Sequence, residues 1–364
     1  MRRWFIFTAL IVAGSVTALV GLEAVLRLPA VFNPGIEAEF VEAAKRRDLD
    51  WVAHPFLPYV GNPGRRFDIH WTDPEGRTTY IVDVQLNSRG FRTHEFPDRK
   101  MDDDLVVVCL GGSTVWGAVA PTNAETWPEL LEAKLQEAHP TRNVRVYNLG
   151  MSGGSTAVSV VNLAIIGVPL QPDLVIAYEG INDTGPVAMH DYKTDQSHYF
   201  VDFVPESNWL GFHYELPGWL RSSRVAVYAA TWLDSIGGAN SLMERVTRES
   251  DPNDHAPPEV AIERTFANLL TIHSIADGHG ARALFSTFQF FDPSVLPYPL
   301  NDGLRRAFAA NGMDYVDIDA RIPDGDRSLQ VDECHFTDAG REIVADSFFR
   351  HIMEHRLLAS EDGG

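Results

Sequence analysis

The pattern of hydrophobic positions divides this chain near residue 105. From there on, short apolar runs of strand length alternate with longer segments in which apolar residues recur every three to four positions. The short runs predict five strands, at residues 105–110, 144–148, 174–178, 283–288 and 315–318. The first run is apolar throughout, as expected of a parallel strand that is covered on both faces.

The segments between these runs have the period of amphipathic helices. Thr126 and Glu129 have the spacing of a capping box, which predicts a helix that runs to about Ala138. Apolar stripes predict two further helices, one through Ile262, Phe266, Leu269, Leu270 and His273 and one through Val344, Phe348 and Ile352. This alternation predicts an α/β fold of three layers, αβα, with a mostly parallel five-stranded sheet in the middle.

Two regions depart from the alternation. Residues 29–104 are punctuated by Pro and Gly and contain alternating patches such as residues 79–84, so we interpret them as a small β-rich extension. Residues 184–258 form an insertion rich in Pro, Gly, His and aromatic residues. This insertion is either a lid or substrate wall, or a peripheral subdomain with an aromatic core. The catalytic domain would then span residues 105–356, and residues 357–364 would fray.

The first 28 residues have the character of a signal anchor. Arg2 and Arg3 precede an uncharged stretch from Trp4 to Leu22, which is within the roughly 17–25 residues that cross a bilayer. No clean small-x-small site follows, which favours a membrane anchor over a removed signal peptide or a soluble core helix. The basic residues before the stretch favour an inside N-terminus, with the catalytic domain outside the cytoplasm, periplasmic or extracellular.

Composition narrows the range of partners. The formal net charge is -20, so the basic footprint that nucleic acid requires is absent. Cys109 and Cys334 could form a disulfide in an exported chain, but Cys109 stands in an apolar strand, where cysteine is commonly a small buried hydrophobe, and this favours a free thiol. A metal site at Cys334 and His335 would need further ligands that the sequence does not suggest, so we expect no metal and no organic cofactor.

Four polar segments follow predicted strands: GGST at residues 111–114, NLGMSG at 148–153, GIND at 180–183 and DECH at 332–335. Active sites of open parallel sheets lie beyond the carboxyl ends of the strands, so these segments are expected to meet. Asp332 precedes His335 by three residues, a spacing that lets a carboxylate orient an imidazole as a general base. Ser113 directly follows the most apolar strand, which we expect to be the central one.

In this order and spacing the four segments resemble the signature blocks of the SGNH (GDSL-like) hydrolase family, over roughly residues 105–356. The resemblance implies a flavodoxin-like αβα fold and a triad of Ser113, His335 and Asp332. It also implies an oxyanion hole made by the backbone N–H groups of Ser113 and Gly153 and the side-chain amide of Asn182. Gly112 stands where the family's common first block has Asp, a departure that bears on the substrate.

Single residues of these segments also fit roles outside a triad. The tetrapeptide GGST recurs at residues 153–156, so Ser155 is a second candidate nucleophile. Ser113 is preferred because it follows the most apolar strand and because the second block already accounts for Gly153. Asp332 could cap the helix that follows it, and residues 182–183 could form an Asx turn.

We therefore expect a membrane-anchored serine esterase that hydrolyses O-acyl esters, O-acetyl or short-chain, of a glycan or lipid through an acyl-enzyme. Its partners would be that acylated substrate and, through the N-terminal helix, the membrane. An O-acyltransferase that modifies an exported glycan would use the same triad. A non-catalytic glycan-binding module of the same fold is the third hypothesis, which the presence of Ser113, Asp332 and His335 disfavours.

Overall fold

The computed structural model describes residues 2–26, 50–188 with gaps at 53, 55, 74, 75 and 77, the residues 192–194, 196, 223 and 225, and residues 258–292 and 299–358. The chain forms two units, residues 1–49 with 208–249 and residues 50–207 with 250–364. Most of the insertion predicted at 184–258 lies outside the described residues, as does the tail from residue 359.

In the first unit the described element is the helix α1, Arg2–Leu26. The carboxylate of Glu23 in this helix accepts hydrogen bonds of 3.0 Å from the Ser223 hydroxyl and from the N–H of Val225. We expected a transmembrane helix over residues 1–28. A helix forms there, but within the described part of the chain no helix has both the length and the apolar character that a bilayer crossing requires. The expectation of a membrane-spanning helix is therefore not supported.

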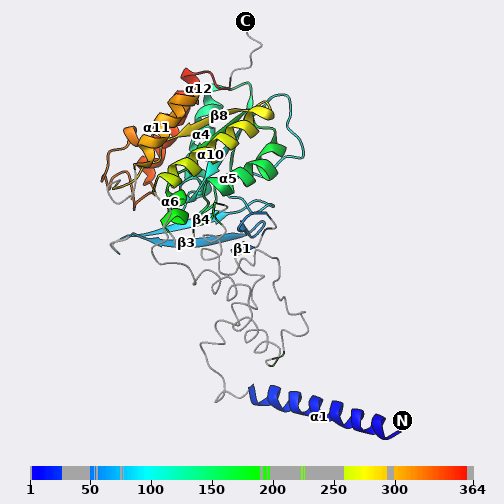
Figure 1. Cartoon of the computed structure of the whole chain (residues 1–364). Helices are drawn as coiled ribbons and strands as arrows, with labels where there is room; N and C mark the ends of the chain where they lie inside the picture. Colours follow the sequence, from blue (N-terminus) through cyan, green and yellow to red (C-terminus); the bar gives the residue numbers. More distant parts are fainter. Residues whose placement is uncertain are drawn as a thin grey trace. The chain divides into compact units, whose positions relative to one another are not determined.

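The second unit is built on the five-stranded parallel sheet that the sequence predicted (Figure 1). In the order β6-β5-β7-β8-β9, its strands are Asn143–Asn148, Asp104–Gly111, Leu174–Tyr178, Arg282–Ser286 and Tyr315–Val316. Neighbouring strands pair in parallel throughout this sheet. β8 and β9 end two residues before the predicted ends, and just beyond them the Thr287 hydroxyl donates to the Asp317 carboxylate at 2.8 Å.

The strand before Ser113 is not the central one, which corrects a prediction. β5 lies beside the edge strand β6, and β7 occupies the centre of the sheet. β5 is nevertheless buried along its whole length, because β6 and β7 flank it and helices cover both faces. The apolar content of a strand indicates that helices cover both of its faces, but it does not indicate the position of the strand within the sheet.

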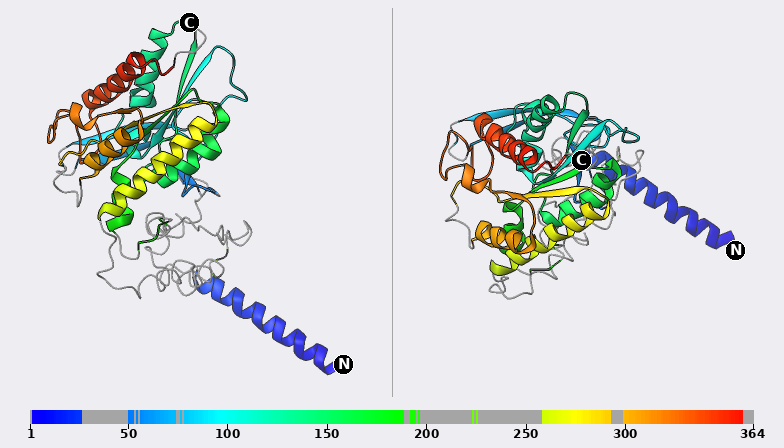
Figure 2. Two further views of the ribbon diagram at one scale, coloured as in Figure 1. Left: turned by 45° about the horizontal axis from the view of Figure 1, so that its top comes forward. Right: turned by 90° about the horizontal axis from the view of Figure 1, so that it is seen from above.

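Helices form a layer on each face of the sheet (Figure 2). On one face α4, Trp127–Ala138, packs against α12, Asp338–Glu354. On the other face lie α5, α10 and α11, with the bounds Thr156–Asn162, Pro258–Gly278 and Leu300–Asn311. The predicted capping box is wrong in its bonds: Thr126 is the N-cap of α4, but its hydroxyl donates to the carbonyl of Asn123 at 2.9 Å.

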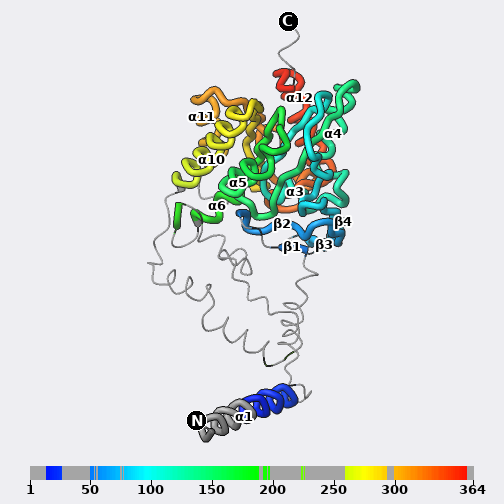
Figure 3. Tube along the Cα trace, turned by 90° about the vertical axis from the view of Figure 1, so that its right-hand side faces the viewer, coloured from blue at the N-terminus to red at the C-terminus, as the bar shows by residue number. Residues whose placement is uncertain are grey.

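Residues 50–104 contain two antiparallel hairpins, in keeping with the β-rich character predicted for the extension. β1, Trp51–Val52, pairs with β2, Val60–Gly61, and β3, Arg66–Thr72, pairs with β4, Thr79–Gln85. The hairpins lie beside the short helix α3, Ser113–Trp116 (Figure 3). Val82 and Val84 of β4 form a small core with Trp116. The extension therefore packs directly on the segment that carries Ser113, while the predicted boundary at residue 104 stays a prediction.

Candidate active site

The polar segments that follow β5 and β6 meet beyond the ends of these strands. The N–H of Met151 donates to the carbonyl of Gly111 at 2.8 Å, and the side-chain amide of Asn148 donates to the carbonyl of Val115 at 2.8 Å. A Cβ atom on Gly150 would lie 2.4 Å from the backbone nitrogen of Trp116. Because only glycine permits so close an approach, Gly150 fixes the second segment against α3.

Ser113 is the first residue of α3 and follows β5 after a single residue, Gly112. Its side chain is almost buried, since Ser113 is 8% exposed. The short helix is closed by Gly117, whose φ of 88° lies in the left-handed region and whose N–H donates to the carbonyl of Ser113. The serine is thus held on a tight turn at the end of a fully buried strand.

His335 lies between Ser113 and Asp332. Its Nε2 atom is 2.8 Å from Oγ of Ser113, and its Nδ1 atom is 2.8 Å from Oδ2 and 2.9 Å from Oδ1 of Asp332. The structure therefore brings together the three residues that the sequence selected. Asp332 is not the helix cap of α12, because Thr337 has that position and its hydroxyl accepts from the N–H of Gly340 at 3.3 Å.

The environment of Asp332 favours its ionised form. Burial raises the pKa of Asp332, but the hydrogen bond with His335 and the backbone N–H groups of Cys334 and His335 together lower it below its ordinary value. These N–H groups lie 3.0 Å and 2.8 Å from Oδ1. An ionised carboxylate at Nδ1 keeps a proton on that nitrogen. The lone pair of Nε2 then faces the Ser113 hydroxyl and can accept its proton.

The segments that carry Gly153 and Asn182 meet beside Gly112, the residue before Ser113. Gly153 has a φ of 72°, a left-handed conformation that glycine adopts without strain. Asn182, in α6 (Ile181–Ala188), donates a hydrogen bond of 2.9 Å from its amide to the carbonyl of Gly154. A Cβ atom on Gly112 would lie 2.3 Å from that amide nitrogen. The absence of a side chain at position 112 therefore makes room for the amide of Asn182 next to Ser113.

Asp183 stabilises the start of α5, whereas the side chain of Ser155, the N-cap residue of this helix, bonds elsewhere. The Asp183 carboxylate accepts from the N–H of Thr156 at 3.2 and 3.3 Å and from the Thr156 hydroxyl. Burial raises the pKa of Asp183 to about 6, against the effect of these hydrogen bonds. The hydroxyl of Ser155 donates to the side chain of Gln196. Ser155 therefore bonds to Gln196, while His335 bonds to Ser113. The side chains of residues 182–183 bond to Gly154 and Thr156 instead of forming an Asx turn.

Arg92 stabilises the segment that follows Ser113 and was not selected from the sequence. It is 1% exposed, and its guanidinium donates to the carbonyls of Gly117 at 2.5 Å and of Ala120 at 2.9 Å. The guanidinium also lies 5.2 Å from the centre of the Trp116 ring. An arginine after a turn carries no local signal for such a role, since its partners are remote in the sequence.

Two aromatic residues of the extension also reach the site. The ring of Trp71 in β3 lies edge-on to the imidazole of His335, with centroids 4.8 Å apart and an angle of 71°. The hydroxyl of Tyr59 donates to the carbonyl of Ser152, the residue before Gly153. The sequence predicted a β-rich extension here but assigned it no part in the site.

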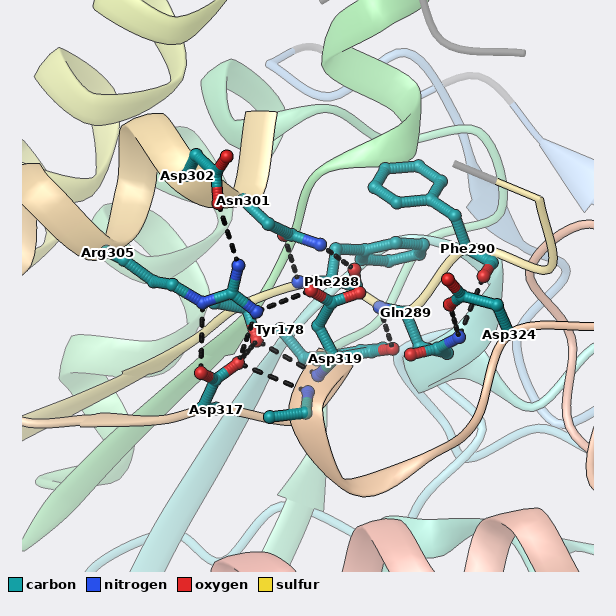
Figure 4. A network of polar contacts seen from close by, with 12 residues as sticks. Tyr178, Phe288, Gln289, Phe290, Asn301, Asp302, Arg305, Asp317, Asp319 and Asp324 are labelled. Atoms are coloured by element: carbon teal, nitrogen blue, oxygen red, sulfur yellow. Dashed lines mark hydrogen bonds and ion pairs between the residues drawn. The ribbon is translucent and has the colours of Figure 1, made fainter. Parts of the chain in front are cut away.

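A polar network around Arg305 supports the chain beyond β8 and β9 (Figure 4). The guanidinium of Arg305 contacts Asp317 through two nitrogen–oxygen pairs of 2.9 Å, and it also bonds to Asp302 and Asp319. The hydrogen bonds from Arg305 and Thr287 outweigh burial, so the pKa of Asp317 is below its ordinary value. Asp317 therefore joins the residue after β8, Thr287, to Arg305 of α11.

The neighbouring segment connects this network to the rest of the site. Asn301 accepts from the N–H of Phe288 at 2.9 Å and donates to its carbonyl at 2.7 Å. The ring of Phe288 stacks on Tyr178, the last residue of β7, with centroids 4.8 Å apart. The N–H of Phe291 donates to the carbonyl of Glu333 at 2.9 Å. This segment thus supports both the strand before Asn182 and the loop that carries Asp332 and His335.

Metal-ligating side chains gather in three groups of the described chain: Asp332 with Cys334 and His335, Asp314 with His351 and His355, and His94 with Glu129 and Glu132. The first group is already joined by the hydrogen bonds around His335. In the third, hydrogen bonds to Glu129 and Glu132 raise the pKa of His94 to about 10. Nε2 of His94 lies 3.2 Å from the carboxylate of Glu129 and 3.0 Å from that of Glu132, so in the structure the imidazole and the two carboxylates hold this group together. Both cysteines are free thiols.

Residues 109–343 of the chain match the model of the GDSL-like Lipase/Acylhydrolase family. No curated protein matches the chain. Similar solved structures include LAE5, an alpha/beta hydrolase from the metagenome of Lake Arreo, with 18% identity and a TM-score of 0.40 over 70% of this chain and 97% of that one.

Two further similar structures are esterases. The acetylxylan esterase Axe2 from Geobacillus stearothermophilus is 14% identical, with a TM-score of 0.40 over 69% of this chain and 96% of its own. The two-domain esterase CEX, active on acetylated mannans, is 12% identical, with a TM-score of 0.42 over 72% of this chain and 52% of its own. Because these TM-scores are below 0.5, the functional assignment rests on the family match and on the geometry of the site.

Proposed function

The chain belongs to the GDSL-like lipase/acylhydrolase family, so it is a hydrolase of ester bonds, and we propose that Ser113 is its nucleophile. The observation that carries this proposal is the continuous hydrogen-bonded chain from Ser113 through His335 to Asp332, with distances of 2.8 Å on each side of the imidazole. Such a chain is what a serine needs in order to lose its proton as it attacks a carbonyl carbon.

In the first half of the reaction, Oγ of Ser113 attacks the acyl carbon of the ester while Nε2 of His335 accepts the hydroxyl proton. Asp332 holds the imidazole in the required tautomer and stabilises the imidazolium that forms. The bond to the alcohol oxygen then breaks, and His335 returns the proton to that oxygen. In the second half, water attacks the acyl carbon while His335 accepts its proton. The bond between the acyl carbon and Oγ of Ser113 then breaks, His335 returns the proton to Oγ, and the acid leaves.

The carbonyl oxygen of the ester becomes negatively charged when Ser113 attacks. We assign the stabilisation of this charge to the N–H groups of Ser113 and Gly153 and to the amide of Asn182. The left-handed φ of Gly153 and the contact between Asn182 and Gly112 support this assignment. In the structure the amide of Asn182 also bonds to the carbonyl of Gly154, which fixes its orientation before a substrate binds.

The substrate that we propose is an O-acetyl or short-chain ester of a glycan or lipid. The low exposure of Ser113 and His335, 8% and 6%, supports a small acyl group, because a confined serine leaves little room for a long chain. A series of p-nitrophenyl esters from acetate to decanoate tests this part, and we expect kcat/KM to fall as the acyl chain grows. A maximum at the long-chain esters would contradict it.

The nucleophile is tested with a matched pair of variants. Ser113→Ala should reduce turnover of p-nitrophenyl acetate by at least about 10³-fold and abolish labelling by a fluorophosphonate probe. Ser155→Ala removes the hydroxyl of the second GGST segment and should keep turnover within a few-fold of the unmodified enzyme. Retained turnover in the Ser113 variant, with loss in the Ser155 variant, would overturn the assignment.

The acceptor of the acyl group is measured in the same assay. With an ester and an added sugar present, we expect the acetate released to equal the ester consumed. Acetyl groups found on the sugar in place of free acetate would instead identify the chain as an O-acyltransferase.

The cellular location is a separate proposal that rests on the sequence. We propose that the domain works outside the cytoplasm, because Arg2 and Arg3 precede the uncharged stretch from Trp4 to Leu22. A C-terminal alkaline phosphatase fusion should be active, and a C-terminal green fluorescent protein fusion should be dark. The reverse result would assign the domain to the cytoplasm.

A further inference from the structure

The contact between Trp71 and His335 connects the β3–β4 hairpin to the candidate active site. The two rings meet in a T-shaped arrangement with their centroids 4.8 Å apart. Trp71 is only partly buried. Its neighbours on the inner face of β3, Phe67 and Ile69, pack on the small core around Trp116. Trp71 lies at the end of this inner row, where the hairpin reaches the imidazole.

The chemistry of His335 shows what must lie beside it during the reaction. When the tetrahedral intermediate collapses, the bond between the acyl carbon and the alcohol oxygen breaks, and that oxygen takes the proton from Nε2. The leaving alcohol must therefore be within hydrogen-bond distance of the imidazole. A residue that packs against the same imidazole is close to the place where the alcohol leaves.

The hairpin presents a suitable surface for a sugar at this place. Tyr80 of β4 lies directly opposite Trp71 in the antiparallel register and on the same face of the hairpin. Both side chains combine an apolar ring with a polar N–H or O–H group, and both remain partly accessible. Sugar rings likewise have apolar C–H faces and polar edges, so aromatic residues of this kind suit them.

The β1–β2 hairpin also packs against the site, and it contacts the β3–β4 hairpin that carries this surface, since the ring centroids of Trp51 and Phe67 lie 6.0 Å apart. The hydroxyl of Tyr59 bonds to the carbonyl of Ser152 beside Gly153, and the ring of Trp51 lies 5.3 Å from that of Trp116. The extension thus contacts the site on the side of the histidine and on the side of the proposed oxyanion donors. A surface held in this way loses little freedom when a substrate binds.

We propose that Trp71 forms the subsite for the leaving alcohol and that this alcohol is a sugar ring, an inference that rests on the proposed function of Ser113 and His335. Trp71 is then a specificity-determining residue contributed by the extension. The acyl group and the alcohol are recognised by different parts of the chain, the acyl group by the sheet-end segments and the alcohol by the hairpin.

The test compares two acetate esters that share their acyl group and differ in their alcohol. Trp71→Ala should raise KM for an acetylated xylo- or manno-oligosaccharide about 5- to 10-fold, and should change KM for ethyl acetate less than about 2-fold. Trp71→Phe should restore most of the difference, because it retains an aromatic ring. Ile69→Ala is the matched control, since Ile69 lies on the same face of β3 and packs on the Trp116 core.

Each outcome of this comparison has a definite meaning. Equal losses for both esters, or the same loss in Ile69→Ala, would show that Trp71 acts only through the fold and would overturn the proposal. Unchanged kinetics for both esters would overturn it as well. If Ser113→Ala retained turnover, the proposed function itself would fail. Loss of turnover in Ser113→Ala with no alcohol-dependent effect of Trp71→Ala would reject the sugar subsite alone.

Discussion

The side-chain amide of Asn182 donates a hydrogen bond of 2.9 Å to the carbonyl oxygen of Gly154. This bond joins the segment that follows β7 to the segment that follows β6, at the point where both approach Ser113. A Cβ atom on Gly112 would lie 2.3 Å from the same amide nitrogen. The amide is therefore oriented by Gly154 and accommodated by Gly112, so both residues bear on its proposed role.

Replacing Asn182 by alanine should reduce kcat about 10²- to 10³-fold with little change in KM, because the amide would act mainly on the charge of the transition state. Steady-state kinetics with p-nitrophenyl acetate measures both constants. Asn311→Ala, at the exposed end of α11, is the matched control and should leave both unchanged. A KM effect without a kcat effect would contradict the oxyanion role.

Gly112→Ala should reduce kcat at least about 10-fold, because the new methyl group would displace the amide of Asn182. Gly278→Ala serves as the control, since a Cβ atom there has open space around it. The decisive experiment is the double variant. If the clash with Asn182 causes the loss, Gly112→Ala should cost almost nothing further in an Asn182→Ala background. Full additivity of the two losses would contradict this mechanism.

Arg92→Lys should lower the free energy of unfolding by about 2–4 kcal/mol, as measured by chemical denaturation. A lysine ammonium cannot reach the carbonyls of Gly117 and Ala120 together, so a buried acceptor would lose its partner. The exposed pair of Arg66 with Asp83 provides the control, and Arg66→Lys should leave stability unchanged. Equal effects of the two substitutions would show that burial of Arg92 does not matter.

His94 should make stability depend on pH in the alkaline range. Hydrogen bonds with Glu129 and Glu132 raise its pKa to about 10, whereas an unfolded histidine titrates near 6.5. A group whose pKa is raised by folding contributes fully to stability below its pKa in the unfolded state. This contribution is lost as the pH rises through its pKa in the folded state. The difference in melting temperature between the unmodified protein and His94→Gln should therefore be largest near pH 6 and disappear by about pH 10.

The control for this prediction is His70→Gln, because His70 is exposed on the outer side of β3. Its melting temperature should follow that of the unmodified protein at every pH. A difference between the His94 variant and the unmodified protein that stays constant from pH 6 to 10 would show that the ion pair with Glu129 and Glu132 does not contribute.

Much of the fold could be predicted from local patterns. The apolar run before Ser113 predicted a strand buried on both faces, and β5 is buried over its full length. The same run could not show that β7, and not β5, is the central strand. Helical coverage makes any inner strand apolar, so apolar content is the same at several positions in the sheet. Thr126 predicted the start of α4 correctly, while the bonds of Glu129 go to His94.

The candidate site was predictable where its residues are close in the sequence or follow strand ends. Asp332 and His335 share one loop, and Ser113 follows β5, so the carboxyl edge of a parallel sheet brings them together. The hydrogen bonds of Arg92 and the ring contact of Trp71 had no such signal. Each depends on how the extension packs against α3 and the residues after it, and a sequence pattern does not predict packing between remote segments.

By itself, the sequence determined the type of sheet, the segments that follow its strands, and the selection of Ser113, Asp332 and His335. These depend on residue periodicity and on short spacings, which are local properties of the chain. Only the tertiary structure decided that His335 lies at Ser113 instead of Ser155, that Gly112 makes room for Asn182, and that Trp71 borders the imidazole. Those relationships arise from side chains that pack across distances of many residues, where shape and burial, not sequence order, select the partners.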